Sequence, residues 1–166
     1  MRILGIDPGY DRLGMAIVEG DASKPQVVWS GCAMPPKGEA QDRLAVVFDE
    51  ISKAIKKHKP DRLAIETLFF NANVSTGIGV AQARGAVLAS AGRAGIAVME
   101  YSPQQVKIAV TGHGAADKGA VARMIPRLVS LSPRKRLDDE LDAIAVAICS
   151  LADRYPQPRV KRIAKK

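Results

Sequence analysis

The chain has 166 residues, 47% of them hydrophobic, which is enough for one domain with a single core. No apolar run approaches the ~18 residues of a membrane span, and the N-terminus leads into a strand rather than into the apolar segment of a signal peptide. We therefore expect a cytoplasmic protein without a membrane association. The net charge of +8 and the sequence pI near 9.7 favour a polyanionic partner, nucleic acid above all.

Three strands are predicted at the start of the chain, over residues 3–7, 13–19 and 26–34. The links between them, the turn PGYD and the polar stretch GDASK, are short, so the strands should be antiparallel neighbours. Residues 40–58 follow as an amphipathic helix, because their apolar side chains recur at helical spacing and basic residues gather at the C-terminal end.

Strands and helices alternate after Pro60. The strands RLAIE and IAVMEY flank a long helix over residues 74–94 that is rich in small side chains. Three more helices are predicted, over residues 103–110, 118–129 and 138–155. Helical crossovers make the first, fourth and fifth strands parallel. The predicted fold is α/β, with a five-stranded mixed sheet of three antiparallel strands and then two parallel ones, and helices on both faces.

The domain is expected to span residues 1–155, followed by a basic and flexible tail over residues 156–166. The tail, PQPRVKRIAKK, holds five basic residues and no acidic one. It either contacts a polyanion or only adds solubility, and the sequence favours neither reading.

Two predicted strands end on a carboxylate, Asp7 after the first and Glu66 after the fourth. Because parallel strands place their carboxyl ends at one edge of a sheet, where open α/β sheets bind ligands, Asp7 and Glu66 should share that edge. In LDDELDAIAVAI, at the start of the last helix, Asp139 and Asp142 are three residues apart and project from one helix face. Taken alone, this acidic turn is more typical of a capped, solvated helix N-terminus than of a metal site.

Carboxylates that converge repel one another and raise each other's pKa unless cations lie among them. Mg²⁺ and Mn²⁺ suit such all-oxygen sites. Two ions ~4 Å apart would activate a water and stabilise the leaving oxygen in phosphodiester cleavage. The four acids therefore predict a metal-dependent nuclease.

Five segments, in order, resemble the RuvC Holliday-junction resolvases of bacteria, which have a ribonuclease H-like fold. They are ILGIDPGYDRLGMAI, AIETLFFNAN, AQARGAVL, YSPQQVKIAVTGHGAADK and DAIAVAI, and they extend over nearly the whole chain. The resemblance implies a nuclease that resolves four-way DNA junctions by paired symmetric nicks, in homologous recombination and DNA repair. It also implies a homodimer, two Mg²⁺ or Mn²⁺ ions per active site, and work beside the RuvA–RuvB branch-migration complex.

By the same resemblance Asp7, Glu66, Asp139 and Asp142 are the catalytic metal ligands. Asp138 is the alternative to Asp139, because Glu140 and Leu141 stand where the family commonly has small residues. Three further residues match DNA-binding positions of the family: Phe69, which would stack on an unpaired base, and Lys107 and Lys118, which would lie near the cut phosphate. Gln82 and Arg84 are either structural or DNA-facing, so neither receives a defined role, and His113 receives none.

Three other functions remain open from the sequence. The first is a RuvC-like nuclease that trims ribosomal RNA precursors, the second an actin-like ATPase or sugar kinase with a similar first strand and turn, and the third a junction-binding module without catalysis. The ATPase generally needs two such domains, and 166 residues hold one.

Overall fold

The computed structural model describes residues 1–68 and 74–153, with the backbone alone for residues 74–76. Five strands form one sheet, and five helices pack on it in the described part of the chain. The strands are β1 (Arg2–Asp7), β2 (Leu13–Glu19), β3 (Gln26–Ala33), β4 (Arg62–Glu66) and β5 (Ala97–Tyr101). The helices are α1 (Ala40–His58), α2 (Val74–Ala94), α3 (Pro103–Thr111), α4 (Lys118–Leu128) and α5 (Asp138–Ala152).

The sheet has the strand order β3-β2-β1-β4-β5. Strand β2 pairs antiparallel with β1 and β3, while β4 pairs parallel with β1 and β5. This confirms the predicted mixed sheet of three antiparallel and two parallel strands. As a result Asp7 and Glu66, the last residues of β1 and β4, lie at the same edge of the sheet.

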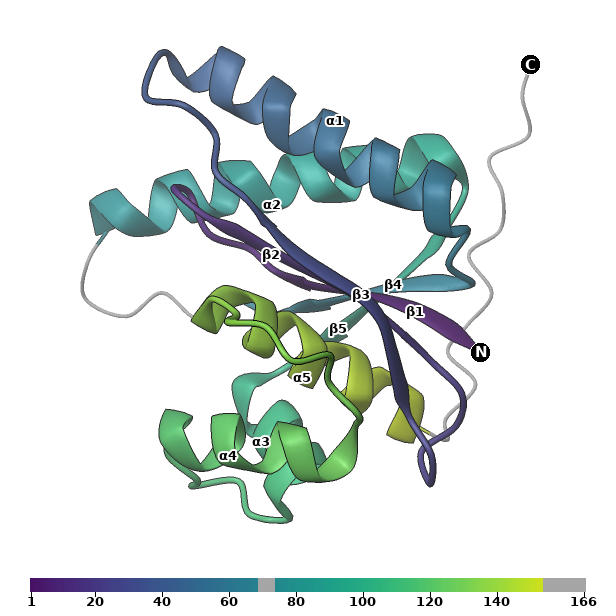
Figure 1. The fold of residues 1–166 in the computed structure, drawn as a ribbon. Helices are drawn as coiled ribbons and strands as arrows, with labels where there is room; N and C mark the ends of the chain where they lie inside the picture. Colours follow the sequence, from purple (N-terminus) through teal and green to yellow (C-terminus); the bar gives the residue numbers. More distant parts are fainter. Residues whose placement is uncertain (69–73, 154–166) are drawn as a thin grey trace.

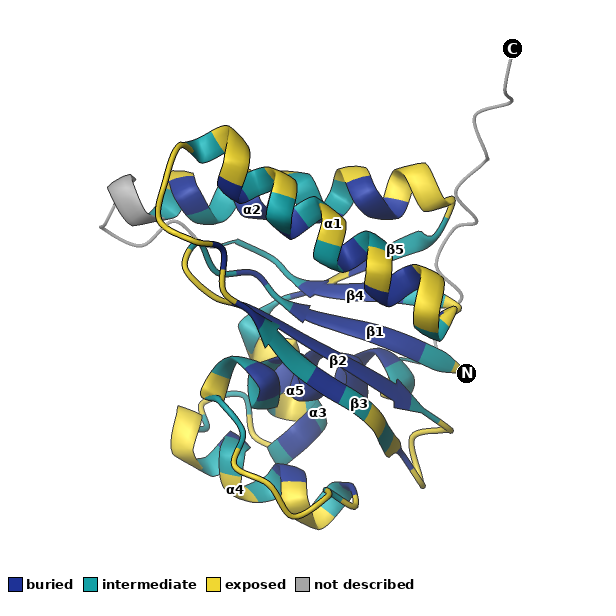
Figure 2. Cartoon of the chain, turned by 45° about the horizontal axis from the view of Figure 1, so that its top comes forward, coloured by how far each residue is buried: buried dark blue, intermediate teal, exposed yellow. Residues whose placement is uncertain are grey.

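Helices cover both faces of the sheet, as predicted (Figure 1). Helices α1 and α2 pack on one face and α3, α4 and α5 on the other, and the strands between the layers are mostly buried (Figure 2). Successive residues of β1 point to opposite faces, so Leu4 and Ile6 join the core under α1 and α2, whereas Ile3 joins the core under α5. Each face thus has its own hydrophobic cluster.

Helix α5 lies close against β1 and β2 because two glycines leave room for its backbone. A Cβ on Gly5 would lie 2.1 Å from the carbonyl oxygen of Ala143, and a Cβ on Gly14 would lie 2.0 Å from that of Asp139. Both distances are far below a van der Waals contact. Because these two residues have no side chain, the first turns of α5, with their acidic residues, can lie directly over the sheet.

Helix caps fix the first turns of α3 and α4. The Ser102 hydroxyl accepts a hydrogen bond from the backbone N–H of Gln105, and the Gln105 side-chain oxygen accepts one from the backbone N–H of Ser102, which completes a capping box. Asp117 caps α4 by accepting from the backbone N–H of Ala120. Lys118 is therefore held at the first position of a capped helix.

The observed ends of six elements differ from the predicted ones, and for β1, β3, β5, α3 and α4 the difference is one residue. Strand β3 ends at Ala33 rather than at residue 34, and the structure describes α5 only to Ala152, not to residue 155. Phe69 and the predicted tail lie outside the described residues, so their roles stay predictions. None of the helices in the described part of the chain is both long and apolar enough to cross a bilayer.

Because α5 approaches the sheet so closely, any side chain at Gly5 should strongly lower the stability of the protein. Gly5→Ala forces its Cβ against the carbonyl oxygen of Ala143 and, at 2.8 Å, the Cβ of Ala147. We expect the free energy of unfolding, measured with urea, to fall by about 1–3 kcal/mol or more. The control is Gly92→Ala, at an exposed position in α2 with nothing within 4 Å of the new Cβ, which should be neutral or slightly stabilising. Equal stability of the two variants would contradict this packing.

Candidate active site

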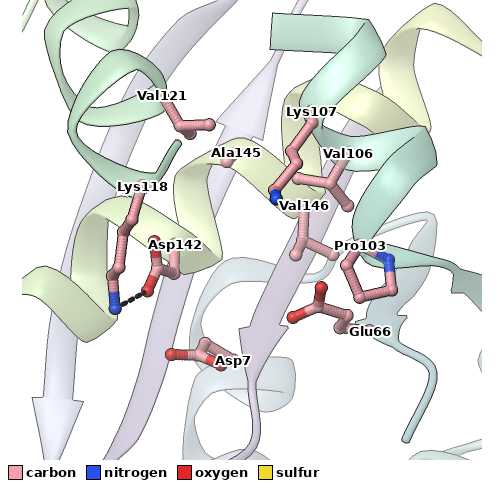
Figure 3. Close-up of a pocket in the computed structure, with 10 residues that line it drawn as sticks. All are labelled: Asp7, Glu66, Pro103, Val106, Lys107, Lys118, Val121, Asp142, Ala145 and Val146. Carbon is pink, nitrogen blue, oxygen red and sulfur yellow. Dashed lines mark ion pairs between the residues drawn. The ribbon is translucent and has the colours of Figure 1, made fainter. Parts of the chain in front are cut away.

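A pocket of about 350 Å³ opens where the ends of β1 and β4 meet α3, α4 and α5 (Figure 3). Its lining residues are Asp7, Glu66, Pro103, Val106, Lys107, Lys118, Val121, Asp142, Ala145 and Val146. Three carboxylates and two lysines predicted from the sequence to act together thus share one cavity. In Figure 3 the carboxylates of Asp7, Glu66 and Asp142 face a common space.

Asp7 is the most strongly perturbed of these acids. Burial, more than any other cause, raises its pKa from 3.8 to about 7. The negative charges of Asp142, Glu66 and Asp139 act in the same direction, and the positive charge of Lys118 opposes them. Asp7 therefore lies where its negative charge is poorly solvated and repelled by three other acids.

Glu66 lies in a similar but less extreme environment. Burial raises its pKa first and the charge of Asp142 second, while Lys107 and Lys118 lower it. Its carbonyl oxygen accepts a hydrogen bond of 2.8 Å from Nη1 of Arg84 on α2. Arg84, which the sequence left without a role, thus contacts the backbone of a candidate catalytic residue.

Lys118 supplies positive charge to the pocket. Its Nζ lies 2.8 Å from Oδ2 of Asp142, and this hydrogen bond is the main reason that the pKa of Lys118 is raised. The charges of Asp7 and Asp138 raise it further. The ammonium group therefore partly offsets the repulsion among the carboxylates.

Asp139 lies beside the pocket rather than in its lining. Its Oδ2 is 3.3 Å from Nε of Arg12, within ion-pair distance, but it is buried and accepts no hydrogen bond. The charge of Asp139 nevertheless reaches Asp7 and raises its pKa, whereas Asp138 is among the charges that act on Lys118. The choice of Asp139 rather than Asp138 as the partner of Asp142 stays a prediction.

Glu140, which stands between the two helical aspartates, points away from the pocket to β3. It is only 5% exposed, and it accepts hydrogen bonds from Oγ of Ser30 at 2.8 Å and from Arg134 at 2.5 Å. Burial raises the pKa of Glu140, but the hydrogen bonds from Arg134 and Ser30 outweigh burial, so the net shift is downward. Glu140 therefore ties the N-terminus of α5 to the sheet.

The donor set of the pocket suits a hard divalent cation, because the three lining acids offer only oxygen. Among the described residues, however, no three Asp, Glu, His or Cys side chains are already placed to hold a metal ion. One of the three carboxylates, that of Asp142, is engaged by the Lys118 ammonium group through its Oδ2. The residues fit a divalent ion by their chemistry and common orientation, and such an ion would compete with the Lys118 ammonium group for the carboxylate of Asp142.

Sequence patterns did not predict three contacts around the site, those made by Arg12, Arg84 and Glu140. Each joins residues that are far apart along the chain, so no local spacing indicates it. Only Glu140 carried a local signal, because an acidic side chain at the third position of a helix is typical of capping.

A mixed sheet in this order, with acids at the ends of two parallel strands and on a helix packed against them, is the arrangement of a ribonuclease H-like nuclease. The family model described as "Crossover junction endodeoxyribonuclease RuvC" matches residues 3–150. The chain belongs to this RuvC family of crossover junction endodeoxyribonucleases.

Individual relatives match over nearly their full length. The protein of that name from Halothermothrix orenii is 42% identical over 150 residues, which cover 90% of this chain and 91% of the relative. The one from Moorella thermoacetica is 41% identical over 165 residues and covers 99% of each chain. The solved structure of Thermus thermophilus RuvC in complex with Holliday junction substrate has a TM-score of 0.84 at 32% identity, and covers 90% of this chain and 92% of that one. The family favours a DNA nuclease over the RNA-trimming nuclease, the ATPase and the non-catalytic binding module.

The raised pKa of Asp7 predicts that the metal-free protein loses stability as the pH rises. In the folded state the Asp7 carboxyl has a pKa of about 7, whereas in the unfolded state its pKa is near 3.8. The free energy of unfolding therefore falls as the pH rises from about 4 to about 7, and it is level above pH 7. Asp7→Asn removes this ionisation. In chelator at pH 8 the variant should be more stable than the wild type by on the order of 2 kcal/mol, with little difference at pH 4.

Urea unfolding across this pH range makes the comparison. The control is Asp49→Asn, at an exposed position of α1. Its free energy of unfolding should vary with pH as that of the wild type does. If the stability of Asp7→Asn also equals that of the wild type at every pH, Asp7 does not lie buried among repelling carboxylates.

Proposed function

We propose that this chain cleaves four-way DNA junctions by metal-dependent hydrolysis of phosphodiester bonds. The observation that carries the proposal is the single pocket in which Asp7, Glu66 and Asp142 face one another beside Lys107 and Lys118, in a member of a junction endonuclease family. The relative from Thermus thermophilus, whose structure contains a Holliday junction substrate, supports the choice of DNA.

The acids have the role of holding divalent metal. Asp7, Glu66 and Asp142 would bind Mg²⁺ or Mn²⁺, two ions in all, and Asp139 would complete the set from the edge of the pocket. When bound, the ions would lower the pKa of the attacking water and stabilise the leaving oxygen. They would also remove the repulsion that raises the pKa of Asp7.

The lysines have the role of receiving the phosphate. Lys118 pairs with Asp142, and its raised pKa keeps it positively charged throughout the physiological pH range. With a metal ion at Asp142, the ammonium group of Lys118 would neutralise a phosphate oxygen at the cut. Lys107, on the opposite wall of the pocket, lies near Glu66 and would contact the same strand of DNA.

Two symmetric nicks in a junction require two active sites, and this chain has the acids of one. We therefore infer a homodimer with a twofold axis that matches the symmetry of the junction. Phe69, three residues after Glu66 in the sequence, would stack on a base opened at the junction centre. The proposed setting is recombination and DNA repair in the cytoplasm, beside the RuvA–RuvB complex.

The test of the function uses a synthetic four-way junction, a linear duplex and an RNA, each with Mg²⁺, Mn²⁺ or chelator. We expect paired nicks in the junction alone, only with metal. Asp7→Asn should lower the cleavage rate by about 100-fold or more while the protein still binds the junction, because phosphate contacts rather than the acids supply affinity.

Two neighbouring variants serve as a matched pair. Asp139→Asn should lower the cleavage rate strongly and Asp138→Asn only weakly, because Asp139 is the proposed metal ligand and its charge acts on Asp7. Cleavage in chelator, equal cleavage of the linear duplex, or full activity of Asp7→Asn would each contradict the proposal.

A further inference from the structure

Arg84 is an arginine buried within a helix of small residues. Its exposed fraction is 9%, and it lies in α2 on the face of the sheet opposite α5. A buried guanidinium is costly unless charge and hydrogen bonds compensate it. Its environment must therefore hold specific partners.

Two partners hold the guanidinium between β4 and β5. Nη1 donates to the carbonyl oxygen of Glu66 at 2.8 Å, and Nη2 lies 2.6 Å from Oε2 of Glu100. Glu100 is half exposed and supplies the countercharge. The planar guanidinium makes both contacts with a fixed geometry, which a lysine cannot reproduce.

The contact with Glu66 falls at the point where β4 leaves the sheet. The backbone N–H of Thr67 donates to the carbonyl oxygen of Tyr101 at 2.8 Å, which fixes the strand on the side of β5. The Glu66 carbonyl is fixed from the other side by Arg84. The peptide that follows the Glu66 side chain is thus held from both α2 and β5.

We propose that Arg84 is a positioning residue for Glu66, setting the backbone from which its carboxylate reaches the metal and substrate. The inference rests on the proposed function, since it assigns Glu66 a metal ligand's task. Arg84 itself touches neither the pocket nor the reacting atoms. Its loss should therefore weaken metal binding at Glu66 and leave the DNA-contacting lysines in place.

If the role of Arg84 were purely structural, its substitution would lower the stability of the protein and change nothing else. Arg62 provides the matched control. Arg62 is the first residue of β4, at the opposite end of the same strand, and it too donates to a backbone carbonyl oxygen, that of Ser150. Arg62→Gln removes an arginine–carbonyl bond from the strand without touching Glu66.

The experiment compares the wild type, Arg84→Gln, Arg84→Lys and Arg62→Gln by two measurements. One is the Mg²⁺ concentration at half-maximal junction cleavage, with junction affinity measured separately. The other is the rise in melting temperature that Mn²⁺ gives the DNA-free protein, which reports metal binding without catalysis.

We expect Arg84→Gln to raise the Mg²⁺ midpoint by about 10-fold and to reduce the Mn²⁺-induced rise in melting temperature, with junction affinity unchanged. Arg84→Lys should be intermediate, and it carries the test alone if Arg84→Gln does not fold. Arg62→Gln should lower the melting temperature yet keep the wild-type Mg²⁺ midpoint.

Two results are adverse, and they are distinguishable. If both Arg84 variants keep the wild-type Mg²⁺ midpoint and Mn²⁺ response beside an active wild type, the positioning role is overturned and the proposed function stands. If the wild type itself neither cleaves the junction nor responds to Mn²⁺, the proposed function fails, and the role of Arg84 fails with it.

Discussion

Repulsion among acids at the edge of the sheet is the constraint on which the rest of this structure depends. Two like charges ~4 Å apart near a protein surface repel by about 4 kcal/mol. The fold nevertheless brings Asp7, Glu66 and Asp142 to one pocket and keeps Asp139 near enough to act on Asp7. The raised pKa of Asp7 reflects this repulsion, and the ion pair of Lys118 with Asp142 offsets part of it. A site that already needs cations is well suited to bind them.

The scaffold is organised to hold these charges together in spite of their repulsion. Gly5 and Gly14 let α5 lie on the sheet, Glu140 anchors its first turn to β3, and the Asp117 cap fixes the helix that begins with Lys118. These contacts lie on the α5 face of the sheet, and Arg84 acts from the opposite face. Rigid elements on both sides of the sheet thus determine where each carboxylate points, as a preorganised site requires.

Sequence patterns were sufficient to predict the sheet, its strand directions and the edge at which Asp7 and Glu66 meet. These follow from local hydrophobic periodicity, short links and helical crossovers, which are readable along the chain. The contacts of Arg84, Glu140 and Arg12 were not predictable, because they join residues 18, 110 and 127 positions apart through side-chain geometry. The exact place of Asp139, beside the pocket lining, likewise depends on how α5 packs rather than on its spacing from Asp142.

The most direct test of the central claim is anomalous diffraction from crystals of this protein grown with Mn²⁺. The account predicts a manganese peak bound by Asp7 together with Glu66 or Asp142, and an ammonium group of Lys118 that has left Asp142. The contradicting result is a pocket without a manganese peak at saturating Mn²⁺, with the ion pair between Lys118 and Asp142 intact.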